Sequence, residues 1–301
     1  MLNKKFIILF LIQVTLGYNI FNHTQDYKVS SSSYTASYNI NNSIYNFFNP
    51  ACNSDNNQFI YSILGNYFNG ILENQQLFFS LNTEILNKIN IALLRTSIDD
   101  IYDTSSAWND HNQNNIVDID EINYNNINTF SHNTLGLILS KPFSINNIRL
   151  GINTKFSISS LFDQHSFSHS FDFGAYKNFN KYSIGLVLKD FLNRSYWTEG
   201  EINKVASQII FGSNFNIKSI NLSFDYNLFD NTYMLGTNYD YNSLVSFQLA
   251  HSTFEKLYLG FLLNFKNFNI GYSFVVPKYT ELGISQRILI GINKDFFNLK
   301  L

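Results

Sequence analysis

Apolar and polar residues alternate one for one over many short stretches of this chain. Between positions 220 and 228, Ile, Leu, Phe, Tyr and Leu alternate with Asn, Ser, Asp and Asn. The same period of two returns over 148–158, 182–189 and 257–265. Successive side chains of a β-strand point to opposite faces, so each stretch predicts a strand with one apolar and one polar face.

The whole chain beyond its first 56 residues divides into about fourteen such stretches. They cover 57–65, 73–81, 87–96, 129–140, 145–157, 166–178, 181–193, 203–216, 218–228, 231–240, 243–251, 255–266, 267–275 and 281–297. Most are close to the length of about 9–11 residues that crosses a membrane as a tilted strand. An even number of strands also brings both ends of a barrel to the same side.

The connections between these stretches differ in length in a regular way. Very short links are predicted near 142–144, 179–180, 217 and 241–242, and longer ones at 97–128, 158–165 and 194–202. Short turns at one end and long loops at the other are typical of outer-membrane barrels. A soluble β-sandwich would carry Lys, Glu and Thr on its outward faces. Here one face is apolar and the other is rich in Asn, Ser and Gly. The pattern therefore favours an all-β fold, a transmembrane antiparallel β-barrel of about fourteen strands.

Composition narrows the class of protein further. Of the 301 residues, 17% are aromatic and 14% are charged, against about 25% charged in typical soluble domains. The high content of aromatic residues excludes a disordered chain. The chain also lacks the repeated apolar runs of about 20 residues that a protein with several membrane-spanning helices needs. A formal charge of -2 argues against nonspecific nucleic-acid binding. Because Cys52 is the sole cysteine, an intramolecular disulfide framework is excluded.

The N-terminal region predicts export and then a separate segment. Residues 1–17 combine Lys4 and Lys5 with an apolar run from Phe6 to Leu16, which is the pattern of a secretory signal peptide. Residues 18–56 show no clean period and are predicted to form a plug inside the barrel, which takes up residues 57–301. Glycines recur in mid-strand on the polar face, which a packed plug or strand curvature would each explain. Lys155 and Lys189 share that face and are expected to line the lumen or to pair with Asp172 or Asp225.

Several short motifs, in this order and spacing, resemble the PorV/PorQ family, a branch of the FadL-like outer-membrane barrels. They are Asn49-Pro50-Ala51, the stretch Leu150–Lys155, the pair Asp172–Tyr176 and Gly185–Lys189, and the closing stretch Leu282–Ile292. The resemblance implies a bacterial outer-membrane barrel with an N-terminal segment inside. It also implies type IX protein secretion, with secretion-system subunits or exported proteins as partners. The alternative is FadL-type uptake of hydrophobic small molecules. Contact with outer-membrane lipid is common to both.

The long link at 97–128 contains seven acidic residues and no Lys or Arg. Its residues 110–121 fit the twelve-residue template of a calcium loop, in which oxygen ligands stand at positions 1, 3, 5, 7, 9 and 12. Those positions are Asp110, Asn112, Asn114, the Ile116 carbonyl, Asp118 and Glu121. Position 6 normally takes Gly, and Asn115 is among the residues that best tolerate a positive φ. The loop is therefore a candidate Ca²⁺ site, with a solvated acidic loop as the alternative.

Catalytic chemistry is not indicated. His165 and His169 share a strand face, but they would lie about 13 Å apart at 3.3 Å per residue, too far for one metal ion. No nucleophile elbow or phosphate-binding glycine loop occurs. We therefore expect a non-enzymatic outer-membrane protein without further cofactors, and keep a membrane-embedded hydrolase as a remote alternative.

Overall fold

Each alternating stretch of the sequence contains a β-strand in the computed structural model, and one stretch is divided into two strands. The structure describes residues 20–23, 43–52, 59–83, 87–253, 257–277, 281 and 283–293. The predicted signal peptide, residues 1–17, lies outside the described residues, as does most of the predicted plug. No helix in the described part of the chain is long and apolar enough to span a membrane.

The strands follow one another along the chain with mostly short connections. Their bounds are β1 Phe59–Tyr67, β2 Leu72–Thr83, β3 Asn87–Asp103, β4 Asn128–Ile145, β5 Ile148–Leu161, β6 Gln164–Phe179, β7 Tyr182–Trp197, β8 Ile202–Lys204, β9 Gln208–Ile217, β10 Ile220–Asn227, β11 Thr232–Asp240, β12 Val245–Ser252, β13 Leu257–Asn264, β14 Phe268–Val276 and β15 Ser285–Asn293. Short 3₁₀ helices are η1 Ile20–His23, η2 Ser43–Phe47, η3 Phe68–Gly70, η4 Ile119–Glu121 and η5 Tyr124–Asn126.

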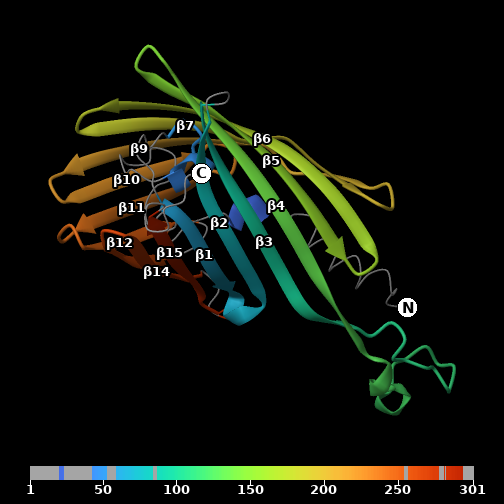
Figure 1. The fold of residues 1–301 in the computed structure, drawn as a ribbon. Helices are drawn as coiled ribbons and strands as arrows, with labels where there is room; N and C mark the ends of the chain where they lie inside the picture. Colours follow the sequence, from blue (N-terminus) through green and yellow to red (C-terminus); the bar gives the residue numbers. More distant parts are fainter. Residues whose placement is uncertain are drawn as a thin grey trace.

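Antiparallel pairing closes these strands into a barrel (Figure 1). Neighbours in sequence are neighbours in the sheet, β1 pairs with β15, and β6 pairs with β7 to complete the ring. The three-residue β8 pairs with the end of β7 and adds no further wall element. The wall therefore has fourteen strands, and the predicted fold class is confirmed.

The two faces of each strand meet different environments, as the alternation predicts. In β10 the polar residues Asn221, Ser223 and Asp225 are buried in the interior, whereas Leu222 on the outward face is 45% exposed. Exposed outward Leu, Ile, Phe and Tyr side chains recur around the whole ring. A soluble protein does not expose so much contiguous apolar surface, but a bilayer covers such a band. The chain is thus an outer-membrane barrel.

The connections confirm most of the predicted asymmetry. Turns of two residues follow β4, β6 and β9 at one end, and the β4–β5 turn uses Asn146 and Asn147 at positive φ, as tight hairpins require. At the other end, residues 104–127 and 198–207 are long. The short link predicted near 142–144 was misplaced, because these residues lie within β4, which runs to Ile145. The prediction of a long link at 158–165 was wrong. Strands β5 and β6 pair as far as Leu161 and Gln164, which leaves a two-residue turn.

The wall is not equally tall all the way round. We call β3–β7 the tall wall, since its strands have 14–18 residues, and β9–β15 the short wall, since its strands have 8–10. The long strands of the tall wall reach well past the rim of the short wall toward the long-loop end (Figure 1). Part of the predicted link 97–128 belongs to this extension, because β3 continues to Asp103.

Candidate functional site: the barrel lumen

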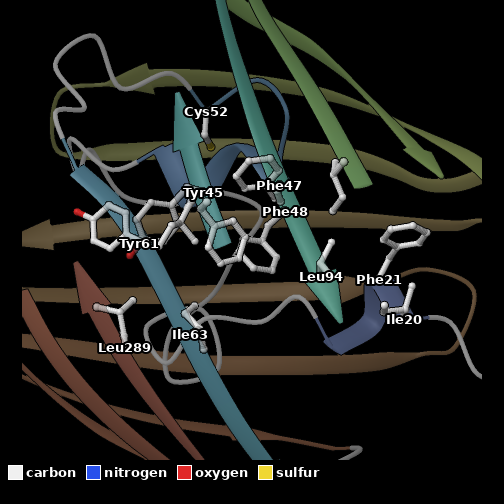
Figure 2. Packing of buried hydrophobic residues seen from close by; sticks show 14 of the residues in the cluster. Ile20, Phe21, Tyr45, Phe47, Phe48, Cys52, Tyr61, Ile63, Leu94 and Leu289 are labelled. Atoms are coloured by element: carbon white, nitrogen blue, oxygen red, sulfur yellow. The ribbon is translucent and has the colours of Figure 1, made fainter. Parts of the chain in front are cut away.

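The described parts of the N-terminal segment lie inside the barrel. Helix η2 contacts β2, β3 and β4, and η1 contacts β3 and β4. Phe47 packs against Phe78 with ring centroids 5.2 Å apart, within a buried cluster that also takes in Ile63, Leu94 and Leu289 from the wall (Figure 2). Residues 43–52 thus fill the lumen at this level. The limits of the segment, 18–56, stay a prediction.

Two mid-strand glycines explain how the segment can approach the wall so closely. A Cβ added at Gly151 would lie 2.8 Å from the Ala51 nitrogen and would overlap the Pro50 carbonyl group. A Cβ at Gly174 would lie 2.8 Å from Cδ of Pro50. The Asn49 side-chain amide also donates to the Ala175 carbonyl at 3.3 Å. At these two positions the glycines serve close packing, one of the two explanations that the sequence left open.

A buried ion cluster lies on the inner face of the tall wall. Lys155 Nζ is 2.6 Å from Asp172 Oδ1 and 3.0 Å from Asp190 Oδ1, and the three side chains are about 1% exposed or less. The cluster also contacts the N-terminal segment, because the Phe21 ring centroid is 5.4 Å from Lys155 Nζ. The side-chain amide of Asn153 donates to Asp172 and to the Phe47 carbonyl. The predicted pairing of Lys155 with Asp172 is confirmed.

Next to this cluster, the pairing of β7 with its neighbour stops. β7 pairs with β9 from Tyr182 to Lys189 and then pairs with β8 from Arg194 to Tyr196. Residues 190–193 of β7 and residues 205–207 have no strand pairing between them, and we call these two segments the wall interruption. The predicted single strand at 203–216 was therefore wrong, since it is split into β8 and β9.

The backbone of β7 is irregular at the interruption. Asp190 and Leu192 have φ of 56° and 55°, a left-handed conformation that is uncommon for residues other than Gly. The register of β7 against β6 also shifts between His169 and Phe173, as at a β-bulge. The ion cluster holds this geometry, because Asp172 Oδ1 accepts the Asp190 backbone N–H at 2.9 Å.

The interruption lies within the apolar band of the barrel. On one side of it along the strands, outward Phe173 pairs with Leu188, and on the other side outward Phe167 pairs with Tyr196. Phe167 and Phe173 are 47% and 39% exposed. Since the bilayer covers such outward apolar residues, the interruption faces lipid rather than water.

A small cavity of about 40 Å³ lies on the inner side of the interruption. Ile20 and Phe21 of the N-terminal segment line it, together with Asn193 of the interruption and Trp197 at the end of β7. Val205, in the other half of the interruption, also lines it. The cavity lies toward the long-loop end relative to Gly151 and Gly174, so the packed N-terminal segment separates it from the short-turn end. Sequence analysis missed this cavity, because its serines are common throughout the chain.

The predicted calcium loop has a defined fold far from this cavity, at the tip of the β3–β4 projection (Figure 1). Asp110 accepts the backbone N–H groups of Asn114 and Asn115, and Gln113 and Asn115 have φ of 57° and 58°. Asn112 donates to Asp118 at 3.1 Å. The positive φ at Asn115 is what the loop template needs at position 6.

The Glu121 side chain stabilises this loop through hydrogen bonds. Its carboxylate accepts the Trp108 indole N–H at 3.1 Å and the His111 backbone N–H at 3.0 Å. The hydrogen bond from Trp108 lowers the pKa of Glu121 below its ordinary value. In the described part of the chain, no three His, Cys, Asp or Glu side chains gather as a metal site. A cation held by Asp110, Asn112, Asn114, Ile116, Asp118 and Glu121 would thus depend on amide and carbonyl oxygens as well, and calcium binding stays a prediction.

Comparison with known proteins gives a match in fold alone. No family model matches the chain, and no curated protein matches it in sequence. A crystal structure of the P. putida toluene transporter TodX matches with a TM-score of 0.55 at 11% identity, over 92% of this chain and 98% of that one. A second TodX structure matches with a TM-score of 0.53 at 10% identity, over 89% and 96% of the two chains. The barrel therefore shares the fold of the TodX structures. Membership of the FadL-like barrels and of their PorV/PorQ branch stays a prediction.

Proposed function

We propose that this barrel passes small hydrophobic molecules across the outer membrane, with the wall interruption as their route from the lumen into the bilayer. The observation that carries the proposal is the position of the cavity. Asn193 and Val205, one from each side of the interruption, both line it. A molecule in the cavity would therefore need to move only through the wall to reach lipid.

The packed N-terminal segment supports a lateral rather than a vertical route. Buried Phe47 and Ala51 lie between the cavity and the short-turn end. Phe191 and Leu192, at the interruption itself, are 38% and 49% exposed and apolar, which suits a hydrophobic molecule that leaves sideways. The P. putida toluene transporter TodX, which shares the fold, supports the same class of function.

An uptake assay tests this proposal. The full chain is expressed in a bacterial outer membrane, and entry of radiolabelled toluene and 1-dodecanol is compared with an empty-vector strain. Val205→Trp fills the cavity beside the interruption and is expected to lower uptake several-fold. Val245→Trp, at a similarly half-buried position on the short wall, is the matched control and should leave uptake unchanged. Uptake equal to that of the empty-vector strain would overturn the proposal.

The secretion role that the PorV/PorQ resemblance implies is the competing prediction. It requires a stable complex with secretion-system subunits or with an exported protein. Affinity purification of the full chain from gently solubilised outer membranes separates the two roles. Co-purified exported proteins that V205W leaves in place would favour secretion, because that substitution alters the cavity and not the outer surface. A hydrolase role is tested by neither assay and stays the remote alternative.

A further inference from the structure

The cavity next to the interruption has an unusual lining for a route of hydrophobic molecules. Six hydroxyl side chains line it, namely Thr134, Ser157, Ser159, Ser166, Ser168 and Ser195. The amides of Asn193 and Asn203 lie among them. Two histidines, His132 and His169, complete the polar part of the lining, and no Lys, Arg, Asp or Glu belongs to it. The lining is therefore polar, and its hydrogen-bonding groups are mostly uncharged.

These hydroxyl groups form pairs that a ligand can join. Ser168 Oγ and Ser195 Oγ are 2.7 Å apart, and Thr134 Oγ1 and Ser159 Oγ are 2.9 Å apart. A hydroxyl group has one donor and two acceptor lone pairs, so each pair keeps capacity for a further hydrogen bond. A hydroxyl or carbonyl oxygen of a ligand would find partners here without leaving a buried polar group of the wall unsatisfied.

The neighbouring charges disfavour an anionic ligand. Lys155, a buried cation on the same inner face, is already bound by Asp172 and Asp190 at 2.6 Å and 3.0 Å. A carboxylate in the cavity would find neither a lysine nor an arginine among the lining residues, and its polar partners would be hydroxyl, amide and imidazole groups. An unpaired buried charge costs far more than an unpaired neutral group, so the lining selects against ionised head groups.

The apolar part of the lining gives the ligand an orientation. Ile20 and Phe21 form one apolar side, and Val205 lies at the interruption. A hydrocarbon tail would lie along these residues and point to the interruption, where Phe191 and Leu192 continue the apolar surface outward. The polar end would remain among the serines of β5, β6 and β7.

We infer that the cavity binds a neutral amphiphile, a molecule with an uncharged hydroxyl or carbonyl head group and a hydrocarbon tail, in preference to a carboxylate or a pure hydrocarbon. This inference rests on the proposed function and names the class of molecule that would pass. The head group contacts Ser168 and Ser195, and the tail faces the interruption.

Binding of three twelve-carbon ligands tests the inference: 1-dodecanol, dodecanoate and dodecane. The purified full chain carries Trp108→Phe, so that Trp197 in the cavity is the remaining tryptophan and reports binding by its fluorescence. Titrations are made in detergent at pH 8, where the free fatty acid is ionised, and are corrected for the partition of each ligand into micelles. Dodecanol is expected to bind about 5- to 10-fold more tightly than dodecane, the gain from one additional hydrogen bond.

A matched pair of double variants assigns that preference to the cavity. Ser168→Ala with Ser195→Ala should lower the affinity for dodecanol about 5-fold and leave that for dodecane unchanged. Ser246→Ala with Ser273→Ala removes two inward, buried hydroxyls from β12 and β14 on the opposite side of the barrel, and should change neither affinity. If the first variant does not fold, the ranking of the three ligands on the otherwise unchanged chain still decides.

The outcomes separate this inference from the proposed function. Dodecanoate as the tightest ligand, or dodecane binding as tightly as dodecanol, would overturn the head-group preference while leaving hydrophobic passage supported. Failure of all three ligands to bind, together with no uptake in cells, would overturn the proposed function as well. Dodecanol as the tightest ligand, with the preference lost in S168A/S195A, supports both.

Discussion

The tall wall and the short wall of the barrel follow the same alternating pattern, yet the irregular features described above lie mainly in the tall wall. From β9 to β15 the described ladders keep one register throughout. In the tall wall the register shifts in β3–β4 and in β6–β7. The tall wall also carries the ion cluster, Gly151 and Gly174, and most of the cavity.

This difference separates the features that form the barrel from the features that we assign to its proposed function. A short strand with alternating faces is enough to cross the bilayer, and the short wall does little more. The departures in the tall wall each cost stability, because left-handed φ values and buried charges are unfavourable. They persist together in the wall that carries the cavity, as expected if the tall wall provides the proposed route.

The largest expected effect comes from the ion cluster. Lys155→Met leaves Asp172 and Asp190 as buried carboxylates without their cation, and we expect a loss of about 3–5 kcal/mol in the free energy of unfolding. Gln248→Met is the short-wall control, since Gln248 is equally buried and donates to Asn238 at 2.9 Å in an uncharged network. Its loss should be about 1–2 kcal/mol. Urea titration in lipid vesicles measures both.

Adding Asp172→Asn and Asp190→Asn to K155M sharpens this result. With Lys155, Asp172 and Asp190 all replaced by uncharged residues, most of the lost stability should return, since a buried ion network replaced as a whole is often nearly neutral. If the triple variant is instead less stable than K155M alone, the cluster acts through its hydrogen bonds rather than its charges.

The next largest effect concerns the packing of the N-terminal segment. Gly151→Ala places a Cβ against the backbone of Pro50 and Ala51, and we expect a loss of about 2–3 kcal/mol, as overpacking typically costs. The segment should also become accessible to added protease. Gly260→Ala on the short wall puts its Cβ 3.1 Å from the end of the Gln248 side chain, which can move. Equal losses in G151A and G260A would contradict close packing as the role of Gly151.

The alternation predicted nearly all strands because each face of the wall meets one uniform environment. It predicted that Lys155 and Asp172 share the polar face, and they are paired. It could not place Asp190, which follows Lys189 and so falls on the apolar face of a regular strand. The positive φ at Asp190 and Leu192 turns Asp190 inward, and neither residue is a glycine that would signal this.

The same reasoning explains why the interruption was missed. Residues 203–216 read as one strand, since Val205, Ala206 and Ser207 contain no Gly or Pro that would mark a break. The break depends on where the irregular part of β7 presents its hydrogen-bonding groups, which is a property of the neighbouring strand. The cavity depends in turn on the break, and therefore could not be predicted from local sequence.

A smaller effect is expected at the tip of the tall wall, where the β3–β4 projection has no counterpart on the short wall. If the loop at 110–121 binds Ca²⁺, the dissociation constant should be roughly 10⁻⁴–10⁻³ M, the range of extracellular sites. Isothermal titration of the full chain measures it. Asp110→Ala should abolish the binding, whereas Asp120→Ala, in the same loop but at no ligand position, should change it little. If the D110A variant shows the same heat of Ca²⁺ binding as the unchanged chain, the cation binds elsewhere.

The smallest expected effect is the response of this loop to acid in calcium-free buffer. Because the hydrogen bond from Trp108 lowers the pKa of Glu121 below 4.5, the carboxylate's contribution to loop order is complete above that pH and is lost as the pH falls through the lowered value. Fluorescence of Trp108, followed in a Trp197→Phe background, should therefore change with a midpoint below pH 4.5, while the barrel stays folded. Glu121→Gln should remove the transition, since the amide does not titrate. A midpoint at or above pH 4.5, or the same transition in E121Q, would show that another titrating group controls the loop. The order of the loop at the tip of the tall wall would then not depend on the Glu121 carboxylate.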